Sequence, residues 1–167
     1  MFSEKKQDGC PSILAIAGPN GSGKSTVTKG LPVIGLYVNA DEIKKASKCS
    51  DLEAAQEAEM IRRALLEARQ DFTFETVLST DRNLLLLEEA KKAGYQICAV
   101  FVLTKDSAIN VLRVRNRVKM GGHDVPEDKI ISRYEKSLQN LSKLVRIADR
   151  TRIVDNSTDV PSVICEV

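Results

Sequence analysis

The stretch Gly18-Pro-Asn-Gly-Ser-Gly-Lys-Ser-Thr26 has the spacing G-x-x-x-x-G-K-[ST] of a phosphate-binding loop. Its glycines allow successive backbone N–H groups to point into one concavity, and the helix that begins behind them adds partial positive charge. We expect Lys24 to reach the β- and γ-phosphates of ATP and Ser25 to ligate Mg²⁺. The predicted nucleotide site comprises Gly18, Pro19, Asn20, Gly21, Ser22, Gly23, Lys24, Ser25 and Thr26.

A carboxylate follows the second predicted strand, Leu36-Tyr-Val-Asn39. Asp41 lies just past its carboxyl end, where ligands bind in open parallel sheets. There it could accept the proton of a substrate hydroxyl while a phosphoryl group is transferred. The other interpretation is that Asp41 caps a helix over residues 42–48, and both roles can hold.

Polar residues also end the third predicted strand. Glu75 and Thr76 close the run Phe72-Thr-Phe-Glu-Thr76, and Arg82 follows shortly after. Their position predicts contacts with the substrate or with groups beside Mg²⁺. From the pattern alone, a polar strand end that faces water is an equal alternative.

Three arginines precede a pair of glycines in a predicted helix. Arg113 and Arg117 are four residues apart and share a helix face, so both could converge on the γ-phosphate, whereas Arg115 points elsewhere. Gly121-Gly122 predicts a hinge, and Arg133 on the next helix could supply a further cation. We therefore expect a lid over residues 113–133, although a solvated basic face is the usual fate of such runs.

Two further polar positions have open interpretations. Asn156, in Asp155-Asn-Ser157, either flanks the nucleotide base or belongs to an Asx turn. His123 is the only histidine, and its loop position favours packing or capping over acid–base catalysis.

Strands and helices alternate along the chain, which predicts an α/β fold built from βαβ units. The apolar runs predict five strands, mainly parallel, that form one sheet covered by helices on both faces. These strands are expected over residues 13–17, 36–39, 72–76, 95–103 and 152–154, and the main helices over 24–29, 51–69, 84–93, 106–120 and 127–148. For the helix over 51–69 we expect Asp51 as the N-cap and burial of Leu52, Ala55, Met60, Ala64 and Leu65.

Length and composition indicate a single three-layer domain over residues 12–167 that follows a flexible tail over 1–11. The 167 residues carry a net charge of +2, and no apolar run approaches the length of a membrane span. The near-neutral charge and an aromatic content of 4% argue against nucleic acid as a partner. The four cysteines are widely spaced, so we expect free thiols and a cytoplasmic protein.

Phosphate-binding loops serve switches, motors, transporters and kinases, so motifs that are missing narrow the choice. The chain has neither an LSGGQ-like signature nor an Asn-Lys-x-Asp run for guanine. Asp41 and the late arginines suit a kinase that acts on a small molecule. The alternative is a regulatory ATPase that hydrolyses ATP slowly and passes phosphate only to water.

Five segments together resemble the small chromosomal relatives of the zeta toxins. They are GPNGSGKST, YVNADEI, FTFETVLST, RVRNRVKMGGHDVPEDKIISRYEKSLQNL and DNS, and they span Ile13 to Ser157. The GGH-x-VP run with its following Arg-Tyr is more specific than the phosphate loop alone.

The resemblance implies a P-loop kinase that transfers the ATP γ-phosphate to a sugar hydroxyl; the better-known zeta toxins phosphorylate UDP-N-acetylglucosamine. It implies roles for Lys24 in phosphate binding, Asp41 as the base, Glu75 and Thr76 on the substrate side, and Arg117 and Arg133 in clamping phosphate. An antitoxin partner is implied only through the family. The chain is shorter than the plasmid toxins and has no sizeable extra segment for a nucleotide-sugar pocket.

Overall fold

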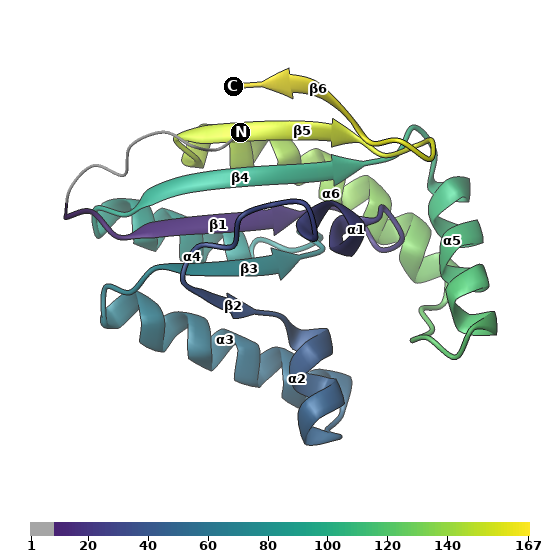
Figure 1. Ribbon diagram of the computed structural model, residues 1–167, viewed down its shortest axis with the longest axis horizontal. Coiled ribbons are helices and arrows are strands. Elements are labelled where there is room, and N and C mark those ends of the chain that lie inside the picture. The colour runs from purple at the N-terminus through teal and green to yellow at the C-terminus, as the bar shows by residue number, and fades with distance from the viewer. Residues whose placement is uncertain (1–8) are drawn as a thin grey trace.

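In the computed structural model, which describes residues 9–167, the predicted apolar strands lie side by side in one sheet (Figure 1). The strand order is β2-β3-β1-β4-β5-β6, and the first five strands are parallel. The strands are β1 (Ser12–Ala17), β2 (Leu36–Val38), β3 (Phe72–Thr76), β4 (Gln96–Leu103), β5 (Arg150–Asp155) and β6 (Ser162–Glu166). The α/β fold with a mainly parallel sheet is thereby confirmed.

The sheet has six strands, not the five that the sequence predicts. The additional strand, β6, pairs antiparallel with β5 at the sheet edge, with Cys165 opposite Ile153. All five residues of β6 are exposed, although Val163, Ile164 and Cys165 are apolar, so this strand is not covered as a central parallel strand is. The pairing of β6 with β5 is made by backbone hydrogen bonds, and the residue pattern of β6 did not predict it.

Six helices accompany the sheet. They are α1 (Lys24–Thr28), α2 (Ala40–Ser47), α3 (Asp51–Glu67), α4 (Arg82–Lys92), α5 (Ser107–Lys119) and α6 (Glu127–Ile147). The cap of α3 differs from the prediction, because Ser50 rather than Asp51 accepts the hydrogen bond from the Glu53 backbone. The Ser50 N–H in turn donates a hydrogen bond to the Glu53 carboxylate at 2.8 Å, which completes a capping box.

The two faces of the sheet are covered unequally. Odd-numbered residues of β1 and β4 pack with α3, α4 and α6 in the larger core, around fully buried Phe72, Phe74 and Phe101. Leu14, Ile16 and Val100 face the other side, where α1 and the segment after it supply the cover. Figure 1 shows this segment in front of the sheet and α4 and α6 behind it. The helices therefore cover both faces, as the sequence predicts.

Helix α3 presents a different face from the one predicted. Leu52 and Met60 are 67% and 69% exposed, and Ala64 is exposed too, whereas Ala54, Ala58 and Arg62 are buried. Of the predicted positions, only Ala55 and Leu65 are partly buried. The apolar residues of α3 are spread around the helix axis rather than gathered on one face, so their spacing did not identify the buried face.

The chain enters the sheet at Pro11, which is buried and whose carbonyl accepts a hydrogen bond from Gln96 N–H at 2.9 Å. Residues 1–8 of the predicted tail lie outside the described residues. The cysteines at positions 10, 49 and 98 are free and half-buried, and Cys165 is free and exposed. None of the helices within residues 9–167 has the length and apolar character needed to cross a membrane.

Candidate active site

A cleft of about 510 Å³ opens at the carboxyl ends of the parallel strands. The phosphate loop, α2, α3, the segment after β3 and α5 form its walls. This placement follows from topology, because loops after neighbouring parallel strands meet at one edge of the sheet. The predicted site residues that line it are Asn20, Gly21, Gly23, Lys24, Ser25, Thr26, Asp41, Glu75, Thr76, Arg82, Arg113 and Arg117.

The phosphate loop requires glycine where other elements press against it. Gly21 and Gly23 have φ angles of +77° and +89°. A Cβ atom on Gly21 would lie 2.5 Å from the Asn110 carbonyl oxygen, and one on Gly23 would lie 2.0 Å from the Asn156 amide nitrogen. Both asparagines also support the loop directly: Asn110 donates to the Asn20 carbonyl and Asn156 to the Ser22 carbonyl, each at 2.7 Å.

Lys24 folds back over the loop that it follows. Its Nζ donates to the carbonyl oxygens of Gly18 at 2.6 Å and Pro19 at 3.1 Å. Burial lowers the pKa of this ammonium to about 8, Glu75 and Asp41 oppose the shift, and Arg117 adds to it. An anion that binds beside Lys24 would stabilise the charged form of this ammonium, which burial disfavours.

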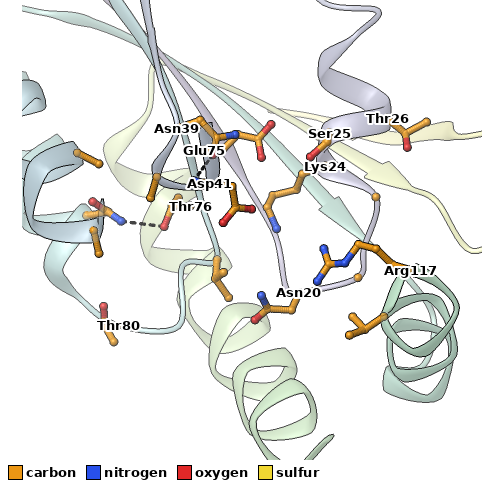
Figure 2. A pocket seen from close by; sticks show the side chains of 18 of the residues that line it. Asn20, Lys24, Ser25, Thr26, Asn39, Asp41, Glu75, Thr76, Thr80 and Arg117 are labelled. Atoms are coloured by element: carbon orange, nitrogen blue, oxygen red, sulfur yellow. Dashed lines mark hydrogen bonds between the residues drawn. The ribbon is translucent and has the colours of Figure 1, made fainter. Parts of the chain in front are cut away.

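Asp41 lines the cleft, and another residue caps its helix. Asn39 is the N-cap of α2, and its side-chain oxygen accepts a hydrogen bond from the Asp41 backbone N–H at 2.8 Å. The alternative role of Asp41 as a cap is therefore wrong. Figure 2 shows the Asp41 carboxylate and the Lys24 ammonium pointing into the same space, with the Arg117 guanidinium turned toward it from α5.

Glu75 is fixed by two hydroxyl groups rather than facing water. Its Oε1 accepts hydrogen bonds from Thr28 Oγ1 at 2.9 Å and from the Tyr37 hydroxyl at 2.6 Å. Burial and the bond to Glu75 raise the pKa of Tyr37, so this phenol stays a donor. The contacts join β2 and β3 to the phosphate-loop helix α1 and hold a carboxylate beside Lys24.

The segment after β3 forms the opposite end of the cleft. Thr76 Oγ1 accepts from Asn83 Nδ2 at 2.8 Å and from Leu78 N at 3.0 Å. Arg82, 59% exposed, forms an ion pair with Glu59 at 3.3 Å. In Figure 2, Thr80 lies at this end, away from Ser25 and Thr26.

Arg113 and Arg117 both reach the cleft from α5, as their spacing predicts. Arg113 Nη1 and Arg117 Nε are buried without a hydrogen-bond partner, so each retains donors for a ligand. Arg117 Nη2 donates to the His123 carbonyl at 2.7 Å. Arg115 forms an ion pair with Glu127 instead, in agreement with its predicted orientation.

Five predicted residues lie beside the cleft rather than on its wall: Gly18, Pro19, Ser22, Arg133 and Asn156. Arg133 Nη1 donates to the Asn20 side-chain oxygen at 3.3 Å, and Asn156 is buried behind Ser22. Ser157 N donates to Asp155 Oδ1 at 2.8 Å, so this segment forms the Asx turn that was the alternative interpretation.

The zeta toxin family model matches residues 35–161 of this chain, well over half of its length. The chain belongs to the zeta toxin family. The resemblance predicted from the five segments is thus confirmed. Among curated proteins, an uncharacterised protein of Haemophilus influenzae is 27% identical over 123 residues, which cover 70% of this chain and 88% of that protein.

Solved structures agree with this zeta toxin family member in fold. A structure from the PezAT chromosomal toxin–antitoxin system of Streptococcus pneumoniae superposes with a TM-score of 0.65 at 16% identity, covering 99% of this chain and 75% of that one. The AvrRxo1-ORF1:-ORF2 structure with ATP gives a TM-score of 0.73 at 18% identity. The superposition includes 96% of this chain but only 59% of the AvrRxo1 chain, so this chain spans less than two thirds of that relative's length.

His123 joins the loop between α5 and α6, which belongs to the lid that the sequence predicts, to α2 and α3 across the cleft. Its Nδ1 lies 3.3 Å from Lys44 Nζ and its Nε2 3.7 Å from an Asp51 carboxylate oxygen, while Lys44 and Asp51 pair at 2.6 Å. We call these three residues the lid contact. It places the only histidine outside the cleft wall, in a packing role.

Sequence reasoning did not find several residues that form the site. Asn39 carries the cap, Asn110 supports the phosphate loop, and Arg62 lines the cleft from α3. Asn is a preferred cap residue, but the helix was predicted to begin at residue 42, whereas α2 begins at Ala40, directly after Asn39. No motif marks Asn110 or Arg62.

Proposed function

We propose that this zeta toxin family member is an ATP- and Mg²⁺-dependent phosphotransferase that phosphorylates a hydroxyl group of a small molecule. The observation that carries the proposal is the position of Asp41. With Asn39 as the helix cap, this carboxylate is free, and it faces Lys24 across a cleft lined by the phosphate loop and two arginines. A carboxylate at this point is placed to accept the proton of an acceptor hydroxyl.

The proposed step forms a bond between the acceptor oxygen and the γ-phosphorus and breaks the bond from that phosphorus to the β–γ bridging oxygen. ADP leaves, and the hydroxyl proton passes to Asp41. Lys24 contacts the β- and γ-phosphates, and Arg113 and Arg117 offset the charge that spreads over the γ-phosphoryl oxygens. Arg133 acts through Asn20, which it holds in place.

The residues present fit Mg²⁺. Ser25 offers an exposed hydroxyl beside the phosphate loop, and Asp41 and Glu75 lie close by. Among residues 9–167 no group of three or more His, Cys, Asp or Glu side chains could hold a metal by itself. Mg²⁺ usually takes few protein ligands and several oxygens from phosphates and water. Ser25 would hold the ion, which supplies neutralising charge at the β- and γ-phosphates.

The family suggests a sugar hydroxyl as acceptor, with UDP-N-acetylglucosamine as one candidate. Glu75, Thr76 and Arg82 stand on the acceptor side in this proposal. The toxin–antitoxin origin of the PezAT structure makes an antitoxin a candidate partner for this chain too.

The test compares Asp41→Asn with Glu42→Gln, which removes the neighbouring exposed charge. Each variant is incubated with γ-labelled ATP and a panel of sugars, sugar phosphates and nucleotide sugars. We expect Asp41→Asn to lower label transfer about 10²- to 10⁴-fold with unchanged ATP affinity, because general base catalysis contributes about that much. Glu42→Gln should transfer label normally.

The result that would contradict the proposal is label in free phosphate alone, released equally by wild type and Asp41→Asn. That outcome would favour the regulatory ATPase.

A further inference from the structure

Arg62 is a cation buried in the wall of the cleft. It lies on α3, is 6% exposed, and its guanidinium carbon lies 5.3 Å from the centre of the Phe74 ring. Ala58 and Ala55, one and two turns earlier on the same face of α3, also line the cleft. Their small side chains leave the space in front of Arg62 open.

Within residues 9–167, no carboxylate forms an ion pair with this guanidinium, although the charge of Glu59 acts on it. Arg62 Nε has no hydrogen-bond partner, and no ion pair among residues 9–167 includes Arg62. The nearest acid, Glu59, pairs instead with Arg63 at 3.6 Å and with Arg82 at 3.3 Å. Burial lowers the pKa of Arg62, the Glu59 charge opposes this shift, and Arg82 and Arg63 add to it. Proteins seldom bury a charge without a partner, because its desolvation is costly.

Arg62 stands at the acceptor end of the cleft rather than at the nucleotide end. It contacts β3 through Phe74 and lies near Arg82, which follows the loop containing Thr80. Figure 2 shows Thr80 on the far side of Asp41 from Ser25 and Thr26. The γ-phosphate already has Lys24, Arg113 and Arg117 on its own side, so Arg62 is available to a different anion.

We propose that Arg62 binds an anionic group of the phosphate acceptor and thereby selects a charged acceptor over a neutral sugar. This inference rests on the proposed phosphotransferase function. A planar guanidinium suits the paired oxygens of a phosphate or a carboxylate, and the Phe74 face holds it in one orientation. The acceptor therefore carries both the hydroxyl that is phosphorylated and a phosphate or carboxylate group.

The test uses Arg62→Met, which removes the charge but keeps an apolar side chain, and Arg62→Lys, which keeps the charge without the fork. Arg63→Met is the matched control, because Arg63 is exposed on the same helix. Label transfer from ATP is measured to neutral sugars, sugar acids, sugar phosphates and nucleotide sugars. We expect wild type to label only anionic acceptors and Arg62→Met to raise their KM about 10- to 100-fold, with ATP affinity unchanged. The KM of Arg62→Lys for anionic acceptors should fall between those of wild type and Arg62→Met.

Thermal unfolding without ligands is the second measurement, and it needs no acceptor. Because the buried charge is unpaired, Arg62→Met should unfold at or above the wild-type temperature. A midpoint several degrees lower would make Arg62 a structural residue and overturn the inference.

Labelling of neutral sugars that is equal in wild type and Arg62→Met would also overturn it, while the phosphotransferase proposal would stand. Label in free phosphate alone would contradict both the Arg62 inference and the phosphotransferase proposal.

Discussion

Lys24 lies against the backbone of the phosphate loop. Its ammonium is held by two carbonyl oxygens of the loop, those of Gly18 and Pro19, and it lies near two carboxylates. Backbone carbonyls are weaker partners for a cation than phosphate oxygens. Nucleotide binding should therefore draw Lys24 off the loop and favour its charged form.

The lowered pKa of Lys24 predicts a pH dependence of nucleotide affinity. The ammonium is charged below a pH of about 8 and loses its proton above it, whereas bound phosphate favours the charged form. Binding therefore takes up a proton and weakens as pH rises. We expect the Kd of a non-hydrolysable ATP analogue to be about tenfold higher at a pH of about 9 than at about 7, measured by calorimetry.

Lys24→Arg is the control for this pH dependence, since a guanidinium stays charged throughout the range. Its affinity, whatever its absolute value, should not change with pH. A wild-type Kd that is flat across the same interval would show that Lys24 is fully charged in the free protein.

The loop between α5 and α6 meets the α2–α3 corner through the lid contact. The His123 ring lies between Lys44 and Asp51, and Arg117 donates to the His123 carbonyl. One loop thus touches both the opposite wall and a residue that lines the site. Figure 1 shows α5, which leads into this loop, beyond the carboxyl ends of the strands.

Loss of the lid contact should loosen the lid without removing a catalytic group. We expect His123→Ala to raise the KM for ATP by no more than about fivefold, because exposed polar contacts contribute little. Asp124→Ala, in the same loop, is the control. Steady-state kinetics would measure both, and a loss of kcat of about 100-fold in His123→Ala alone would place the histidine in the chemical step.

The domain as a whole is organised so that one end of its sheet carries the site. Parallel strands β2, β3, β1 and β4 all point their carboxyl ends toward the cleft, and the larger core behind them holds α3, α4 and α6 in place. A ligand in this cleft contacts the phosphate loop, α3 and α5 at once. Binding should therefore stabilise the whole fold rather than one loop.

Nucleotide should raise the unfolding temperature of the protein. At a free concentration of about 100 times Kd, a ligand that binds only the folded state adds about 2.7 kcal/mol. For a domain of this size that corresponds to about 5 to 11 °C. Differential scanning fluorimetry with a non-hydrolysable ATP analogue and Mg²⁺ would measure the shift. Lys24→Met should remove most of it, and an equal shift in this variant would show that the nucleotide binds elsewhere.

Local features could be read directly from the residues. The phosphate loop is one contiguous segment whose glycines meet a local backbone requirement, so its place between β1 and α1 could be predicted from spacing. The same holds for the shared face of Arg113 and Arg117 and for the buried parallel strands, since helical and strand periods repeat over a few residues.

Features that depend on distant contacts could not be read in this way. Asp41 had two compatible roles until the structure showed Asn39 as the cap. Strand β6 is defined by its pairing with β5, and the buried face of α3 by its packing on the sheet. Arg62 lies in the cleft without an ion pair because α3 packs against Phe74 and because Glu59 forms ion pairs with Arg63 and Arg82 instead. Burial and the choice of an ion-pair partner are properties of the packed molecule, since they depend on residues that are remote along the chain.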